Sequence, residues 1–153
     1  MAEMKFKFTI QPYQTGAVDS VVGVFAGQPF NDHFTYRRDV EIRRDVTNWR
    51  LSDEELYMGF ANAKVQLDSG QLLENIRRIQ TRNNIKISDS LKSGGLGVCS
   101  LDVEMETGTG KTYVYIKTMF ELNKLYGWSK FIVVVPSIAI REGVQKSFET
   151  MQE

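Results

Sequence analysis

The chain has 153 residues, of which 19 are lysine or arginine and 19 are aspartate or glutamate. Its formal net charge is therefore zero, so there is no overall basic charge to argue for nucleic-acid binding. Hydrophobic residues make up 42% and charged residues 25%, which excludes a disordered tail or a fibrous repeat and favours one globular core. One cysteine excludes an internal disulfide, and the lack of a signal-peptide or membrane-length apolar run predicts a soluble, cytoplasmic protein without a membrane partner.

Residues 1–29 are predicted to form a short strand followed by a helix. Residues 5–10 alternate polar and apolar side chains, a pattern typical of a half-buried strand. Pro12 suits the first turn of a helix, and apolar residues at three- and four-residue spacing continue to Phe25. The sequence Gly-Gln-Pro at 27–29 ends this helix.

Residues 30–97 are predicted to be an insertion or helical region. Ser52 and Glu55 have the spacing of a capping box and predict a helix that runs to Phe60. Apolar residues from Leu72 to Ile79 recur at helical spacing and predict another helix. The region ends in a glycine-rich stretch, and this composition predicts a loop.

Residues 98–153 carry the clearest pattern. They predict, in order, a strand over 98–105, a loop over 106–110, a helix over 111–126, a strand over 131–135 and a helix from 137 towards 148. This order is that of a βαβ unit. The sequence therefore predicts an α/β fold in which helices flank a parallel sheet.

The segment Thr107-Gly108-Thr109-Gly110-Lys111-Thr112 joins the first predicted strand of this unit to its helix. Glycines let successive N–H groups point at phosphate oxygens, and the helix adds its positive N-terminal end. Lys111 would reach the β- and γ-phosphates of a nucleoside triphosphate, and the Thr112 hydroxyl would ligate Mg²⁺. The strict phosphate-loop pattern has glycine where this chain has Met105. The alternative is a glycine-rich turn with an incidental lysine, which the strand–loop–helix context disfavours.

Three stretches, residues 104–115, 120–124 and 134–144, resemble the restriction subunit of type III restriction-modification enzymes. The similarity extends to residues 73–80 and 11–14. The resemblance implies a superfamily-two helicase-like ATPase, with these 153 residues forming the N-terminal part of a RecA-like domain. It also implies an ATP-dependent motor that acts on double-stranded DNA with a methyltransferase (modification) partner and a distant nuclease.

The resemblance gives roles to three further residues. Gln14 matches a glutamine that reads adenine through its side-chain amide, whereas without the resemblance it is an exposed glutamine in a first helical turn. Ser137 and Arg141 match a motif that contacts a DNA strand. The alternative is that Ser137 caps a helix and Arg141 is solvated, and capping is compatible with phosphate contact.

A second acidic motif, Asp-Glu after a buried strand, is needed for hydrolysis in this superfamily. The adjacent pair Asp53-Glu54 lies upstream of the phosphate loop and follows no apolar strand, so it is expected to be a charged helix start. The chain is thus expected to be a piece of a longer protein, with an incomplete catalytic set, weak nucleotide binding and negligible hydrolysis. The rival interpretations are another superfamily-two helicase, a non-catalytic nucleotide-binding module, and a remnant that does not fold stably.

Overall fold

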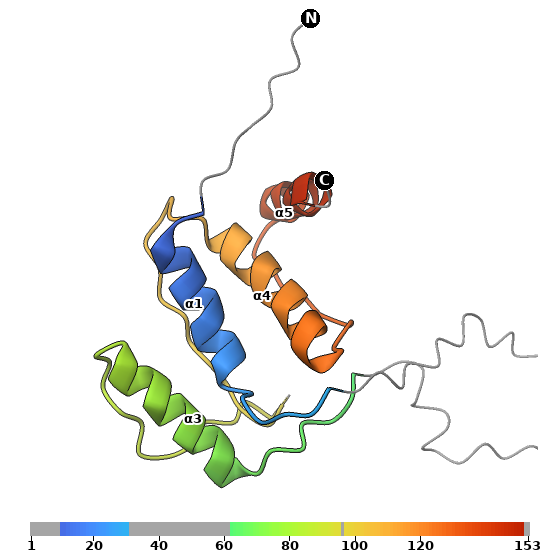
Figure 1. The fold of residues 1–153 in the computed structure, drawn as a ribbon. Helices are drawn as coiled ribbons and strands as arrows, with labels where there is room; N and C mark the ends of the chain where they lie inside the picture. The colour runs from blue at the N-terminus through green and yellow to red at the C-terminus, as the bar shows by residue number, and fades with distance from the viewer. Residues whose placement is uncertain (1–9, 31–61, 96, 152–153) are drawn as a thin grey trace, which may run out of the picture.

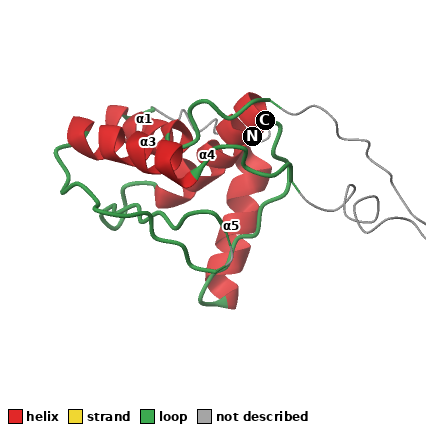
Figure 2. Cartoon of the chain, turned by 90° about the horizontal axis from the view of Figure 1, so that it is seen from below, coloured by secondary structure: helices red, strands yellow, loops and turns green. Residues whose placement is uncertain are grey.

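The computed structural model describes residues 10–30, 62–95 and 97–151. Within them the chain forms four helices, α1 (Pro12–Gly23), α3 (Ser69–Arg82), α4 (Lys111–Tyr126) and α5 (Ile138–Met151). Helix α1 lies along α4 and α3 packs against α1, whereas α5 contacts α4 near the start of α4 (Figure 1). Seen from below, α5 points away from the other three helices (Figure 2). No helix in the described ranges is both long and apolar enough to cross a membrane.

The four helices confirm the helical predictions made for these ranges. Helix α1 has proline in its first turn, as expected, because that turn needs no N–H partner. Helix α3 opens with a capping box: Asp68 Oδ1 accepts from the Gln71 N–H at 2.8 Å, and Gln71 Oε1 accepts from the Asp68 N–H at 3.0 Å. Helix α4 starts after Gly110 and ends before Gly127.

The predicted parallel sheet is wrong for the described part of the chain, which contains no strand. Residues 98–105 and 131–135 are the two predicted strands of this unit, but they have no ladder hydrogen bonds. Side chains of both stretches instead line an apolar groove of about 510 Å³ beside α4. A run of β-branched residues favours extended backbone, but a strand also needs a neighbour within hydrogen-bonding distance. The α/β, RecA-like fold class is therefore corrected to helices joined by loops in these ranges.

The main core lies between α1 and α4 and is closed by an aromatic cluster. Its buried members come from both helices and from the turn that follows α4: Val18, Val22, Val114, Leu122, Tyr126 and Trp128. The Trp128 ring centroid lies 4.9 Å from that of Phe25 and 5.3 Å from that of Tyr126, in edge-on and tilted arrangements. The polar ends are satisfied as well, because Tyr126 Oη donates to Val22 O and Trp128 Nε1 donates to Ala63 O.

Three amide side chains tie the loops to this core. Asn75 is buried in α3 and donates through Nδ2 to the carbonyls of Val24 and Ala26, at 2.9 and 3.0 Å. Gln28, also buried, accepts from the Gln66 N–H and donates to the Lys64 carbonyl. Asn62 accepts from the N–H groups of residues 129 and 130. The chain around residues 62–66 is therefore held to the segment that follows α1 and to the turn after α4.

Several predictions lie outside the described residues. These are the strand over 5–10, the helix from Ser52 to Phe60 and the Asp53-Glu54 pair within it.

The thiol of Cys99 is half-buried, and burial raises its pKa above the ordinary value. Because the thiolate is the reactive form, a raised pKa lowers the reactive fraction near neutral pH. We expect iodoacetamide to alkylate Cys99 more slowly in the native chain than in the urea-unfolded chain. The pH at which alkylation reaches half of its maximum should be higher for the native chain. Mass spectrometry of the alkylated fraction against pH measures both midpoints. Equal midpoints in the native and unfolded chains would contradict this prediction.

Candidate functional site

The glycine loop, which we define as residues 106–110, enters α4 through two glycines in the left-handed region. Gly108 has φ +81° and Gly110 has φ +85°, a conformation that costs a side-chain-bearing residue about 1–2 kcal/mol. The Thr109 hydroxyl donates to the Glu106 carbonyl at 2.7 Å, which closes the loop on itself. A Cβ atom built on Gly108 meets nothing within 4 Å, so the space above this residue is open.

The N-terminal end of α4 is not capped by a side chain of the described residues. The first backbone hydrogen bond of the helix runs from the Val114 N–H to the Gly110 carbonyl at 3.1 Å. The N–H groups of the first three helical residues therefore lack an intrahelical acceptor and form the positive end of the helix dipole. Such an end, preceded by left-handed glycines, suits a polyphosphate.

Lys111 and Thr112 occupy the first turn of α4. Lys111 is exposed, and Thr112 is half-buried. An exposed ammonium group at a helix N-terminus is available to an anion, and a hydroxyl beside it is a hard ligand for Mg²⁺ when phosphate oxygens supply further ligands. The described residues contain no cluster of three or more histidine, cysteine or acidic side chains that could hold a metal ion without phosphate.

The start of α1 contacts the glycine loop directly. Gln14 Nε2 donates to the Thr109 carbonyl at 3.0 Å, and Tyr13 Oη donates to the same oxygen at 3.2 Å. Gln14 Oε1 accepts from the backbone N–H of Gln11 at 3.2 Å. A Cβ atom on Gly110 would lie 2.5 Å from Gln14 Nε2, so a larger residue at position 110 would push the Gln14 amide away from the loop.

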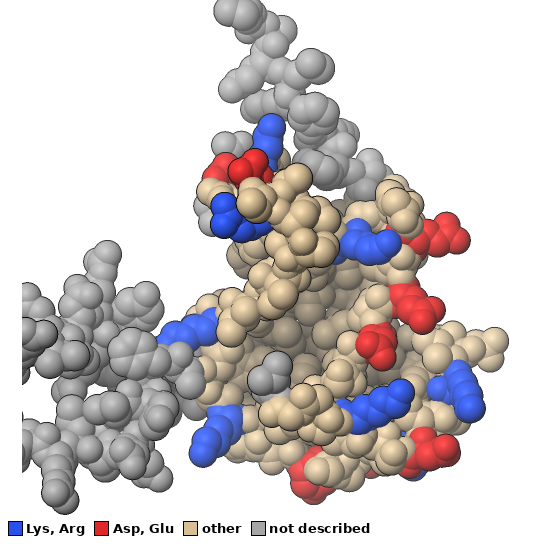
Figure 3. Space-filling view, turned by 180° about the vertical axis from the view of Figure 1, so that it is seen from behind, with Lys and Arg blue, Asp and Glu red and all other residues tan. Residues whose placement is uncertain are grey.

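The apolar groove beside α4 begins next to this loop. Its lining is predominantly apolar and includes Met105, Val114 and Phe131, with Lys111 at one end. Figure 3 shows this hollowed face with largely uncharged walls and with charged side chains around its rim. The hydroxyl of Tyr115 is buried along the groove and has no hydrogen-bond partner in the described part of the protein.

Ser137 and Arg141 lie at the beginning of α5, away from the glycine loop. Ser137 Oγ accepts from the Ile140 N–H at 3.4 Å, and its carbonyl accepts from the Arg141 N–H at 3.1 Å. Ser137 therefore occupies the capping position that the sequence indicated, and both side chains are exposed. An exposed serine and arginine one turn apart can also meet a phosphate.

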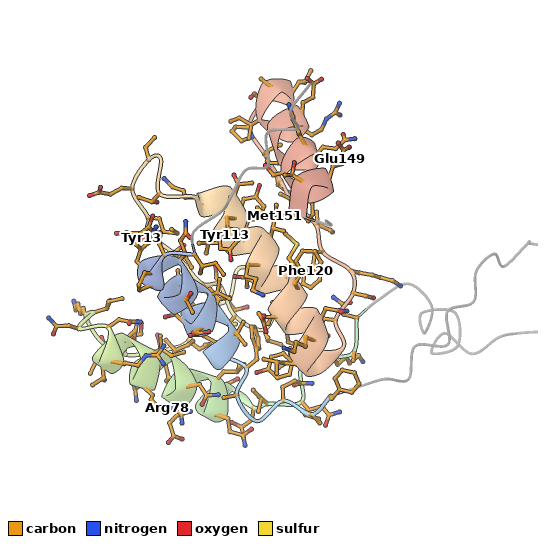
Figure 4. All side chains as sticks on the ribbon, turned by 45° about the horizontal axis from the view of Figure 1, so that its top comes forward. Tyr13, Arg78, Tyr113, Phe120, Glu149 and Met151 are labelled. Carbon is orange, nitrogen blue, oxygen red and sulfur yellow. The ribbon has the colours of Figure 1, made fainter. Side chains whose placement is uncertain are left out.

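The structure brings together Gln14 and residues 107–112, which are almost 100 positions apart in the sequence, and leaves Ser137 and Arg141 on a separate helix. Sequence reasoning missed Tyr13. Figure 4 shows Tyr13 at the start of α1 and Tyr113 in the first turn of α4. The available signal was its position next to Gln14, but a tyrosine in a first helical turn carries no distinctive motif.

Comparison with known proteins gives a consistent result. Residues 73–153 match the family model for the type III restriction enzyme Res subunit. The chain is 35% identical over 139 residues to the EcoP15I Res subunit of Escherichia coli, an alignment that covers 89% of this chain and 12% of the relative. It is 34% identical over 132 residues to the EcoPI Res subunit of Escherichia phage P1, which covers 86% of this chain and 11% of the relative.

A third relative is more similar over a shorter stretch. The StyLTI Res subunit of Salmonella typhimurium is 59% identical over 46 residues, which amount to 30% of this chain and 5% of the relative. All three curated relatives are much longer than this chain, which spans 12% of the first and 11% of the second.

Proposed function

The chain belongs to the type III restriction enzyme Res subunit family, and from this premise we propose that its glycine loop binds the phosphates of ATP. In the proposed activity, ATP bound with Mg²⁺ is the fuel of a DNA motor coupled to endonucleolytic cleavage. Double-stranded DNA is the proposed substrate, and a DNA methyltransferase (modification) subunit is the proposed partner.

One observation carries the nucleotide proposal: two left-handed glycines lead into the uncapped N-terminus of α4, with Lys111 as its first residue. Backbone N–H groups, a helix dipole and an ammonium group all favour negative charge at this place. In the proposed complex Thr107 to Gly110 wrap the phosphates and Lys111 contacts the β- and γ-phosphates. The Thr112 hydroxyl is the proposed protein ligand of Mg²⁺, which neutralises phosphate charge when bound.

The amide of Gln14 supports adenine as the proposed base. A glutamine amide has two donor hydrogens and two acceptor lone pairs. The contacts with Thr109 and Gln11 use one of each, so one hydrogen and one lone pair remain. Adenine offers an acceptor at N7 and a donor at N6, which match the two remaining positions. Gln14 can therefore hold the loop and read the base at the same time.

DNA contact is proposed for the start of α5. Ser137 and Arg141 are exposed there, and α5 buries no residue among those described. A phosphate at this helix N-terminus would meet the Arg141 guanidinium and the amides that Ser137 does not cap.

The test of the nucleotide proposal is a titration of the 153-residue chain with a fluorescent ATP analogue in the presence of Mg²⁺. We expect the wild-type chain to bind weakly but saturably. Lys111→Ala should raise the dissociation constant about tenfold, because a charge-assisted contact to phosphate is lost.

Lys117→Ala is the matched control for this titration, because it removes a lysine from the same helix. Lys117 Nζ pairs with Glu121 at 2.8 Å on the surface, away from the loop, and an exposed pair of this kind contributes little. We expect the control to change the dissociation constant less than about twofold. Absence of saturable binding by the wild-type chain, or equal effects of the two substitutions, would refute the nucleotide proposal.

A further inference from the structure

We infer that Tyr13 is a positioning residue for phosphate binding, acting with Gln14 through the Thr109 carbonyl to aim the N–H of Gly110. The inference rests on the proposed function of the glycine loop. It adds a residue to which neither the sequence motif nor the comparisons gave a role.

The first step of the argument is that two donors converge on one acceptor. Tyr13 Oη and Gln14 Nε2 approach the Thr109 carbonyl oxygen at 3.2 and 3.0 Å. Both come from the first turn of α1, whose body is fixed by the buried Val18 and Val22 in the core shared with α4. The two donors therefore hold the carbonyl from a rigid element, and its oxygen faces α1.

The second step follows from the peptide bond between Thr109 and Gly110. This bond is trans, since the described residues contain no cis peptide, and in a trans peptide the C=O and N–H bonds point in opposite directions. With the oxygen held towards α1, the Gly110 N–H points away from α1. Among the described residues no backbone acceptor takes this N–H. It is thus kept available for an external anion.

The third step concerns the freedom of the peptide plane. This plane rotates through ψ of Thr109 and φ of Gly110, and glycine at position 110 permits rotations that other residues resist. A loop with glycine on both sides of Thr109 can flip this plane unless its carbonyl is held. Tyr13 is 52% exposed, so burial does not fix its ring, and its hydroxyl is held by the hydrogen bond to the Thr109 carbonyl.

The experiment compares Tyr13→Phe with the matched control Tyr115→Phe, which removes a hydroxyl that has no hydrogen-bond partner among the described residues. Binding of ATP, GTP and inorganic tripolyphosphate to the 153-residue chain is measured by calorimetry with Mg²⁺. We expect Tyr13→Phe to weaken all three about threefold, the effect of one neutral hydrogen bond, and Tyr115→Phe to leave them unchanged. A loss confined to ATP would assign Tyr13 to the base and overturn the inference.

A second readout needs no nucleotide. The ¹³C resonance of the Thr109 carbonyl should shift in Tyr13→Phe and in Gln14→Ala, and the two shifts should not add, because both donors share one oxygen. An unchanged resonance overturns the inference even if the chain binds ATP. If the wild-type chain binds none of the three phosphate compounds, both the proposed function and this inference fail. If the wild-type chain binds them and Tyr13→Phe binds them equally well, only the role of Tyr13 is overturned.

Discussion

Replacement of Trp128 by alanine is expected to lower the free energy of unfolding by about 3–5 kcal/mol. The indole is buried, its ring packs on Phe25 and Tyr126, and its Nε1–H donates to the Ala63 carbonyl at 3.1 Å. The substitution removes this packing, opens a cavity and leaves the Ala63 carbonyl without its partner. Urea denaturation followed by far-UV circular dichroism measures the loss without relying on tryptophan fluorescence.

Two further substitutions calibrate this result. Trp128→Phe keeps an aromatic ring but loses the hydrogen bond, so it should cost clearly less than alanine. Leu125→Ala, near the end of α4 and at a side chain that is 45% exposed, should cost less than about 1 kcal/mol. If Trp128→Ala costs no more than Leu125→Ala, the aromatic cluster does not hold α1 against α4.

The second large effect is expected at Gly110. Alanine there must adopt φ +85°, at about 1–2 kcal/mol, and its Cβ would displace Gln14 Nε2, which breaks a hydrogen bond that contributes about 1 kcal/mol. Gly110→Ala should therefore lower the free energy of unfolding by about 2–3 kcal/mol in the same urea experiment.

Gly108→Ala separates the two causes, because position 108 has a similar φ of +81° but open space around the added methyl group. It should show only the conformational cost. In a Gln14→Ala background Gly110→Ala should become as mild as Gly108→Ala, since the displaced contact no longer exists. Equal costs of the two glycine substitutions in the wild-type background would argue against the close approach of Gln14.

The sequence predicted the helices well because their signals are local. Helix α4 lies between Gly110 and Gly127, and α3 begins at a capping box, so both boundaries depend on a few neighbouring residues. The sheet was predicted wrongly because Phe131 to Val135 specify extended backbone but not the neighbour with which it would pair. Pairing depends on distant segments, which local patterns do not encode.

The site was predictable in part for the same reason. The glycine loop is a contiguous motif, so its residues could be named from the sequence, and the structure places it at a helix N-terminus as expected. The contact between Gln14 and Thr109 spans 95 positions and could be anticipated only through the family resemblance. The contact of Tyr13 and the anchoring of α1 by Asn75 depend on tertiary arrangement alone, and no spacing in the sequence marks them.

The bonds from Gln28 to the backbone at positions 64 and 66 couple the ends of two helices. Gln28 follows α1, and the neighbouring Ala63 carbonyl accepts from Trp128 Nε1 in the turn after α4. The segment at residues 62–66 therefore bridges the end of α1 and the end of α4. A shift of α4 along α1 would have to break these bonds as well as the core contacts, so they help to keep the N-terminal end of α4 in register with α1.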